Sequence, residues 1–281
     1  MPKKTTKRPG PAFLATVITA GLVLLVVLIL SIVKVLQVSK IYEDEAREHE
    51  YVLQYRPDIP SGPSGVTDQH PESNNPGSSS DSVNTDIPGT EETEGNYGDS
   101  HLAELLAQYP DVVGWIYVPA TNIDYPFVQA VDNSYYIHRN LAGNYLYSGT
   151  PFLDYACNSD FSDKNSVIYG HNMKNGSMFS TLGNYKNADV FSENRYFYII
   201  LPDRALTVEI FACSVISAYS SKTAFVYSVS PGENFIEDLR SSARRFRELD
   251  FTDDDRYVTI STCDYEFNGA RVVLIGRIIE E

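Results

Sequence analysis

The sequence predicts a mainly β domain, an eight-stranded barrel, preceded by an N-terminal anchor and a tether. Eight short runs rich in Val, Ile, Tyr and Phe follow Pro110, separated by Gly, Asn, Asp and Pro turn signals. A short amphipathic helix precedes these runs, and a second helix interrupts them before the seventh. A closed or nearly closed barrel is favoured because it removes the exposed sheet edges that so many short strands would otherwise present.

The N-terminus predicts a membrane anchor. Residues 1–11 are basic, and residues 12–33 carry no charge at all. At ~1.5 Å rise per residue this apolar run forms a helix about 33 Å long, enough to cross a ~30 Å hydrocarbon core. It has no small-residue cleavage pattern, which favours an uncleaved span over a signal peptide, and its unbroken apolar character argues against a buried core helix. The basic excess before the span predicts a cytoplasmic N-terminus and an extracellular remainder.

Residues 34–99 are expected to form an extracellular stalk and linker. The charged stretch 41–55 can continue as a helix, whereas the following stretch is rich in Pro, Gly, Ser and acidic residues. Such a stretch buries too little apolar surface to offset its ordering entropy, so a disordered acidic tether is predicted. The folded unit then spans residues 100–281, about 180 residues, which is ample for one hydrophobic core.

Composition excludes several classes of function. The net charge of −15 comes without a basic stripe, which argues against nucleic-acid binding. Neither C-x-x-C nor H-E-x-x-H spacing occurs, so no metal site and no cofactor are predicted. The acidic residues 253–255 are interpreted as a solvated turn rather than a calcium site.

Two helices are predicted in the folded unit. The first follows Asp99 or Ser100 as its N-cap, and its apolar stripe consists of Leu102, Leu105, Leu106 and Tyr109. The second begins with a capping box of Ser230 and Glu233, with Pro231 at the first helical position. Its predicted apolar face contains Phe235, Ile236, Leu239, Ala243 and Phe246, and its solvent face contains Arg240, Arg244, Arg245 and Arg247.

Three residues near strand ends could together perform acyl transfer. Cys263 ends the seventh run, His171 follows the fourth after a glycine, and Arg271 begins the eighth. A thiolate can attack a carbonyl, an imidazole can move protons, and a cation can hold the oxyanion. Each residue alone also has an ordinary interpretation, as a buried small hydrophobe, a satisfied loop histidine or an edge-strand charge.

Together these stretches resemble the sortases, the membrane-anchored cysteine transpeptidases of Gram-positive surfaces. The family pattern T-L-x-T-C corresponds to residues 259–263, with Ile260 in place of the usual leucine, and His171 and Arg271 stand in the expected order. The resemblance covers roughly residues 100–279 and is closest to class B. The matching stretches are "PDVVGWIYVPATNIDYPFVQ", "FLDY", "SDKNSVIYGHNMKNGSMF" and "STCDYEFNGARVV".

The resemblance implies a sortase-type barrel and a defined reaction. Cys263 would be the nucleophile that attacks a Thr–Gly or Thr–Asn bond in the C-terminal sorting signal of a surface protein. His171 would be the general acid and base, and Arg271 would hold the substrate carbonyl. An amine of peptidoglycan or of a pilin lysine would then resolve the thioacyl enzyme, with hydrolysis as a slow side path. The sorting motif and the acceptor stay open, as does an assisting role for Asp264.

Two other functions are carried as alternatives. A catalytically silent extracellular barrel would act as a scaffold or adhesion module, and its Cys263 would not react with thiol reagents. A simple cysteine peptidase would hydrolyse its substrate even when an amine is added.

The remaining cysteines and histidines are interpreted as structural. Cys157 and Cys213 lie in or beside apolar runs, and a disulfide between them is left open. His101 and His138 are read as surface or packing residues, and His49 and His70 belong to the stalk and tether.

Overall fold

The computed structural model describes residues 10–60 and 101–279. These residues belong to two compact units, residues 1–48 and residues 49–281. The basic N-terminus, the tether from residue 61 onward with His70, and the predicted caps Asp99 and Ser100 lie outside the described residues.

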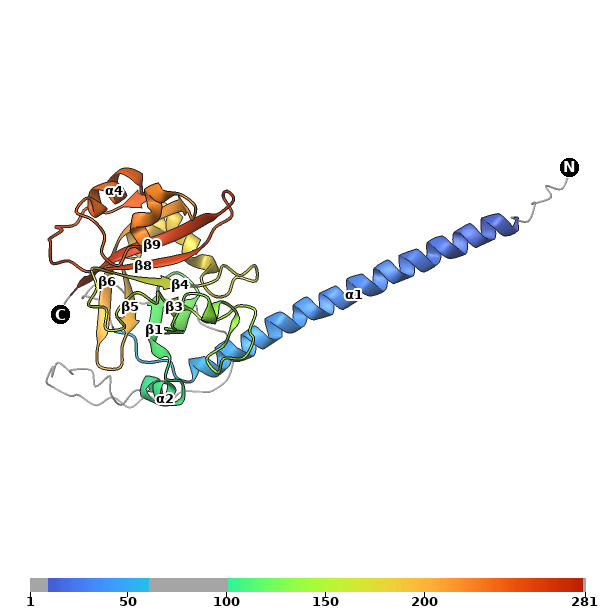
Figure 1. Ribbon diagram of the computed structural model, residues 1–281, viewed down its shortest axis with the longest axis horizontal. Helices are drawn as coiled ribbons and strands as arrows, with labels where there is room; N and C mark the ends of the chain where they lie inside the picture. Colours follow the sequence, from blue (N-terminus) through green and yellow to red (C-terminus); the bar gives the residue numbers. More distant parts are fainter. Residues whose placement is uncertain (1–9, 61–100, 280–281) are drawn as a thin grey trace, which may run out of the picture. The chain divides into compact units, whose positions relative to one another are not determined.

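Helix α1 (Pro11–Leu53) runs without a break through the predicted span 12–33 and most of the predicted helical stalk (Figure 1). Its most apolar window has a mean hydropathy of 3.0, and it is the one helix among the described residues that is long and apolar enough to cross a membrane. The predicted apolar helix is therefore present, and its length is compatible with a single-pass anchor.

The predicted barrel is confirmed. Within the described residues the strands are β1 (Val112–Val118), β2 (Ile123–Val128), β3 (Phe152–Leu153), β4 (Asn165–Tyr169), β5 (Tyr196–Ile200), β6 (Ala205–Ser217), β7 (Arg245–Phe246), β8 (Tyr257–Cys263) and β9 (Ala270–Ile279). Their order is β5-β1-β2-β3-β4-β8-β9-β6, and the pairing of β5 with β6 closes this ring of eight. The two-residue β7 is an addition on the edge of β6.

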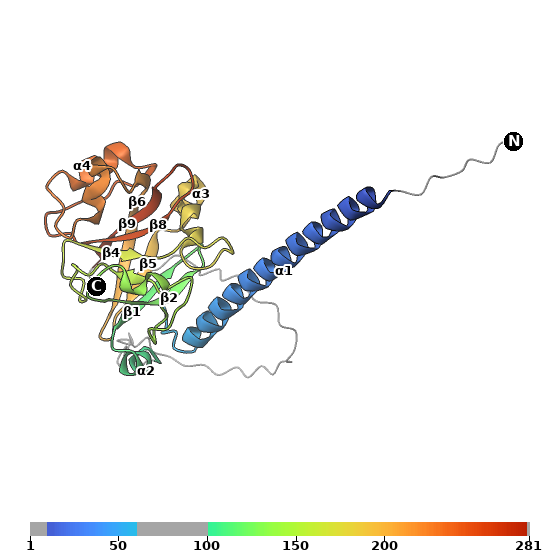
Figure 2. The same ribbon diagram turned by 45° about the vertical axis from the view of Figure 1, so that its right-hand side comes forward.

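Short helices cover the outside of the barrel. Helix α2 (His101–Gln108) packs on β1 through Leu102 and Leu105, as its predicted stripe requires. Helix α4 (Phe235–Ser242) lies over the outer face of β6, β8 and β9, and Figure 2 shows it at the upper left of the barrel with α3 (Ala188–Glu193) at the upper right. The 3-10 helices are η2 (Tyr135–His138), η3 (Ser180–Lys186) and η4 (Ser221–Tyr227).

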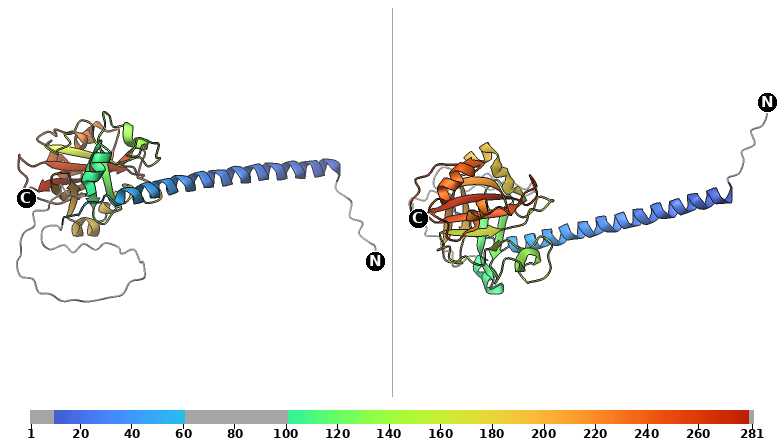
Figure 3. Two further views of the ribbon diagram at one scale, coloured as in Figure 1. Left: turned by 90° about the horizontal axis from the view of Figure 1, so that it is seen from below. Right: turned by 45° about the horizontal axis from the view of Figure 1, so that its top comes forward.

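Side chains on β8 and β9 alternate between two environments. Val258 and Ile260 of β8 join the cluster that fills the barrel, as do Val272 and Leu274 of β9. Residues at the alternate positions, Tyr257 of β8 and Val273 of β9, instead join the cluster beneath α4. Because successive strand residues face opposite sides of a sheet, this alternation continues to the ends of the strands, where Cys263 and Arg271 share the outer face. Figure 3 shows the β8–β9 hairpin from two further sides.

The end of α1 packs against the barrel inside the second unit. His49 stacks on Tyr125 of β2 with ring centroids 4.4 Å apart. Arg56 forms an ion pair of 2.6 Å with Asp124, whose other oxygen accepts a hydrogen bond from the Trp115 indole. His49 and Arg56 are thus held on β1 and β2.

The predicted start of the second helix is wrong. The helix begins at Phe235 with Asn234 before it, and the proposed capping box of Ser230 and Glu233 is not part of it. The cause is tertiary: the buried Asn165 of β4 donates from its amide to the carbonyls of Val226 and Ser228, and its N–H donates to Val229. The residues held by Asn165 lead out of η4, with extended backbone at Ser228, so the helix starts only after the turn that follows them.

The helix also ends earlier than predicted. Ala243 is extended, and Arg245 and Phe246 pair with β6 instead of continuing the helix. The prediction that the arginines of this helix all face solvent is therefore only partly correct. Arg240 is on the helix and pairs with Glu237 and Glu248, whereas Arg247 turns inward to the carbonyls of Ile210 and Phe191.

Candidate functional site

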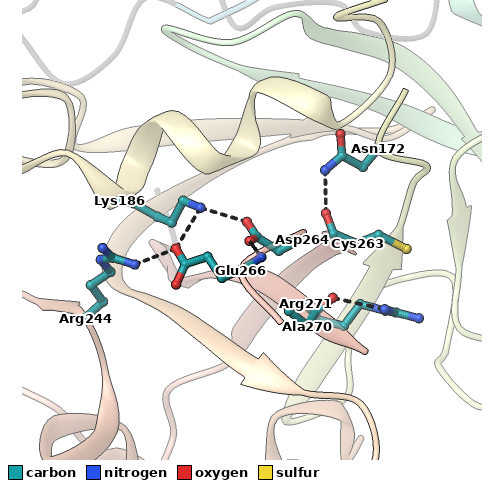
Figure 4. Close-up of polar contacts among 8 residues, drawn as sticks. All are labelled: Asn172, Lys186, Arg244, Cys263, Asp264, Glu266, Ala270 and Arg271. Atoms are coloured by element: carbon teal, nitrogen blue, oxygen red, sulfur yellow. Dashed lines mark hydrogen bonds and ion pairs between the residues drawn. The ribbon is translucent and has the colours of Figure 1, made fainter. Parts of the chain in front are cut away.

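The β8–β9 hairpin brings Cys263 and Arg271 together. They are directly opposite in the antiparallel ladder, so their Cα atoms are about 5 Å apart and their side chains share one face. Figure 4 shows the thiol and the guanidinium projecting to the same side of the hairpin. The Arg271 Nη1 donates to the carbonyl of Ala270 at 3.0 Å, which leaves the rest of its fork directed along that face.

His171 reaches the same place from β4. Strand β4 is parallel to β8, with Tyr169 opposite Ser261, so the residues two positions further on are His171 and Cys263. The N–H of Gly170 continues this ladder by donating to the Ser261 carbonyl at 3.1 Å. A Cβ on Gly170 would lie 2.5 Å from the Phe179 ring, so glycine at this position lets the ring pack directly on the backbone before His171.

The hydrogen bonding of His171 defines its neutral form. Its Nε2 lies 2.8 Å from the carbonyl oxygen of Ile137, and since a carbonyl can only accept, Nε2 carries the proton. Nδ1 is then the free acceptor. Burial lowers the pKa of His171, the bond to Ile137 opposes this, and the neighbouring His138 lowers the pKa further. The ring is therefore neutral near pH 7 and ready to accept a proton.

Aromatic and hydroxyl groups form the outer surface beside these residues. The Tyr227 hydroxyl lies 3.1 Å from Ser261 Oγ, and its ring is 5.9 Å from that of Tyr169. Burial raises the pKa of Tyr227, while Arg271 lowers it and Cys263 raises it, which places this hydroxyl within electrostatic reach of both. No sequence pattern indicates Tyr227 as part of the site, because it belongs to η4, which is remote along the chain.

Asn172 is a second residue that the sequence reasoning missed. Its amide donates to the Cys263 carbonyl at 2.6 Å, so the loop after β4 is fastened to the end of β8. Figure 4 shows this bond on the side of Cys263 away from Arg271. Its position directly after His171 could have indicated this role, since residues that follow β4 lie beside the end of the neighbouring strand β8.

Asp264 is directed away from the thiol. Its carboxylate forms an ion pair of 2.8 Å with Lys186, which also contacts Glu266 at 3.0 Å, and Arg244 joins Glu266 (Figure 4). Burial raises the pKa of Asp264, but the hydrogen bond and charge of Lys186 and the backbone N–H groups of Glu266 and Tyr265 together outweigh burial, so the pKa is lowered overall. Asp264 is thus a charged anchor of the β8–β9 loop in this structure.

The other two cysteines are buried and free. Cys157 and Cys213 form no disulfide, and burial raises the pKa of each thiol to about 12. Cys263 is free and only half-buried. In the part of the chain that the structure describes, no group of three or more His, Cys, Asp and Glu side chains could hold a metal ion.

This arrangement suits acyl transfer. A half-buried thiol, a neutral imidazole with a free nitrogen and a guanidinium lie at adjoining strand ends on one outer face. The rigid ladder fixes their spacing, which is the condition under which a nucleophile, a proton acceptor and an oxyanion partner act together.

Comparison with known proteins agrees with this chemistry. The sequence model of the sortase domain matches residues 116–279, more than half of the chain. Sortase B of Listeria monocytogenes is 33% identical over 186 residues, covering 63% of this chain and 74% of that protein.

Solved structures give the same result. A class B sortase of Streptococcus pyogenes involved in pilus biogenesis has a TM-score of 0.59 and 34% identity, over 63% of this chain and 97% of that one. Sortase B of Clostridium perfringens has a TM-score of 0.56 and 32% identity, over 63% of this chain and 99% of that one. The chain therefore belongs to the sortase family, in class B, and is a cysteine transpeptidase.

Proposed function

We propose that this protein cleaves the C-terminal sorting signal of surface proteins at a Thr–Gly or Thr–Asn bond and transfers the threonine carbonyl to an amine. The observation that carries the proposal is the opposition of Cys263 and Arg271 on β8 and β9, with His171 at the adjoining end of β4. Cys263 is the nucleophile, His171 the general acid and base, and Arg271 the oxyanion partner.

In the first half-reaction the Cys263 thiol loses its proton and the sulfur attacks the threonine carbonyl. Nδ1 of His171 accepts the proton, because Nε2 is occupied by the Ile137 carbonyl. The guanidinium of Arg271 stabilises the oxyanion that forms. When the peptide bond breaks, His171 gives the proton to the departing amine, which leaves a thioacyl enzyme.

In the second half-reaction an incoming amine attacks the thioacyl carbonyl. His171 takes a proton from this amine and returns one to the departing Cys263 sulfur, so an amide bond replaces the thioester and the enzyme is restored. Water can take the place of the amine, which gives hydrolysis as a slow side path.

The acceptor is an amine of peptidoglycan or a pilin lysine. The similarity to the Streptococcus pyogenes class B sortase involved in pilus biogenesis supports keeping the pilin lysine as one of the two. We infer further that α1 anchors the protein in the cell membrane, with its N-terminus in the cytoplasm and the barrel outside, which is supported by its apolar length and the basic residues before it.

The test uses the full chain in detergent micelles, a panel of quenched sorting-motif peptides, and mass spectrometry with and without an added amine. We expect a thioacyl adduct on Cys263 that is absent in Cys263→Ala and that the amine converts to an amide product. The peptide that reacts names the sorting motif.

Two results would contradict the proposal. A folded chain that forms no adduct with any peptide, and whose Cys263 resists alkylation, would leave the silent scaffold as the better function. Peptide cleavage whose product is always the free acid, even with amine in excess, would indicate a simple cysteine peptidase.

A further inference from the structure

His138 lies in ring contact with His171. The two imidazole centroids are 5.2 Å apart and the ring planes are inclined by only 12°, which is a stacked arrangement. His171 is half-buried, whereas His138 is exposed. His138 therefore covers one side of the His171 ring and separates part of it from water.

The position of His138 is fixed by its own contacts. Its Nδ1 donates to the Tyr147 carbonyl at 2.7 Å, and its ring stacks on Tyr147 with centroids 5.8 Å apart and planes 25° apart. The ring centroid of Tyr145 lies 6.2 Å from that of the His138 ring. A ring held by one hydrogen bond and two aromatic neighbours has few alternative rotamers, so its contact with His171 is well defined.

Helix η2 contacts His171 in two ways, through a backbone carbonyl and through a side-chain ring. Ile137 of η2 accepts the proton of Nε2, and His138, the next residue, stacks on the ring. Gly149 packs against the Ile137 carbonyl at a φ of +62°, where a Cβ would lie 2.2 Å from that oxygen. The chain around η2 is thus closely packed and presents the carbonyl and the ring as one rigid unit.

The hydrogen bond alone leaves one motion of His171 free. A single bond along Nε2 fixes the direction of the ring but still permits rotation about that axis. A stacked ring removes this rotation, because turning His171 would break the face contact. The plane of the imidazole decides where Nδ1 lies relative to the Cys263 thiol.

We propose that His138 is a positioning residue for His171, whose ring face it covers so that Nδ1 is held in line with the Cys263 thiol. The inference rests on the proposed role of His171 as general acid and base. His138 does not touch the reacting atoms and acts through the neighbouring ring.

The titration of His171 reports this contact without any substrate. The titratable and charged groups on the surrounding elements include Arg139 after η2, Cys263 on β8, Arg271 on β9 and Tyr265 on the β8–β9 loop, and His138 on η2 is the one that acts electrostatically on His171. Burial and the nearby His138 both lower the pKa of His171. Removing the His138 ring weakens both effects, so the pKa of His171 should rise.

The experiment compares three variants of the full chain in micelles. His138→Ala removes the ring, and His138→Phe keeps a ring but removes the charge and the bond to Tyr147. His101→Ala is the matched control, because His101 is also exposed and also bonds a backbone carbonyl through Nδ1, at 3.0 Å to Gln54, but belongs to α2.

Two readouts are taken: the NMR titration of the His171 ring and the rate of thioacyl adduct formation with saturating peptide. For His138→Ala we expect a raised pKa of His171 and a rate about 10- to 100-fold lower, with KM nearly unchanged. His138→Phe should recover the rate to within about threefold of the unchanged chain, with a smaller rise of the pKa, because stacking is retained. His101→Ala should alter neither.

The inference is overturned if His138→Ala keeps the normal rate, or if His138→Phe is as slow as His138→Ala. It is also overturned if the His171 titration is the same in all variants. Failure of the unchanged chain to form any adduct would instead sink the proposed function, and the titration would still show whether His138 governs the state of His171.

Discussion

Cys213 and Cys263 lie on the two strands that flank β9, yet their environments are opposite. Cys213 of β6 pairs with Leu274 and faces the filled interior of the barrel. Cys263 of β8 pairs with Arg271, which lies three residues before Leu274 on β9. The Cys263 side chain faces the outer surface. An odd separation along one strand places the two partners on opposite sides of the sheet.

The difference shows how one strand supplies both stability and chemistry. Cys213 belongs with Leu274 to the apolar cluster that fills the barrel. Burial raises the pKa of the Cys213 thiol to about 12, so this thiol is inert at neutral pH. Arg271 gives Cys263 a cationic neighbour where the ladder ends and solvent can enter. The same residue type is a buried packing group at Cys213 and the proposed nucleophile at Cys263, according to its register against β9.

Thiol alkylation of the native chain gives the largest expected contrast. At pH 8 a thiol with a pKa of about 12 has about one thiolate in 10⁴ molecules, and Cys157 and Cys213 are also shielded from the reagent. We expect iodoacetamide to label Cys263 alone, with the other two labelled only after denaturation. Peptide mapping by mass spectrometry measures the sites. Rapid labelling of Cys213 in the folded chain would contradict the buried environment.

The barrel was open to prediction because its strands carry their own signals. Each of the eight predicted runs contains a strand, since runs rich in Val, Ile, Tyr and Phe between turn residues are typical of β-strands. A strand–loop–strand of the length between Cys263 and Arg271 can bring both side chains to one face, and the two residues are paired in the structure. The sequence patterns therefore lead to the barrel and to the order of the three proposed site residues.

Features set by remote contacts were not open to prediction. The capping box at Ser230 obeys every local rule, but the amide of Asn165 holds the preceding residues extended and delays the helix to Phe235. The local sequence of His138 is that of an ordinary surface or packing residue, because nothing in it shows that η2 folds against the residues after β4. Local patterns carry no information about such long-range pairings.

Replacing Arg271 by leucine makes the partner of Cys263 resemble that of Cys213. If the cation stabilises the oxyanion, Arg271→Leu should lower the rate of thioacyl adduct formation by about 10²–10³. Arg271→Lys should recover only part of this loss, because lysine keeps the charge but not the planar fork. The rate is measured with the peptide identified above, and circular dichroism checks that both variants fold. A leucine variant as fast as the unchanged chain would remove Arg271 from the site.

Serine substitution at each cysteine compares the same two positions by stability. In Cys213→Ser a hydroxyl enters the apolar interior of the barrel without an arranged partner, so we expect a loss of about 1–3 kcal/mol in the free energy of unfolding. In Cys263→Ser the hydroxyl is half-exposed and the change should stay within about 0.5 kcal/mol.

Thermal unfolding in micelles, followed by near-ultraviolet circular dichroism, measures both variants, and a domain of this size shifts its Tm by about 2–4 °C for each kcal/mol. Cys213→Ala is the matched control, because it loses the sulfur without adding a polar group, and its difference from Cys213→Ser isolates the cost of the buried hydroxyl. Equal shifts for Cys213→Ser and Cys263→Ser would mean that the two faces of β9 do not differ in polarity. A large loss confined to Cys213→Ser would show that one face of β9 is reserved for packing, which leaves the other free to carry a reactive thiol at little cost to the fold.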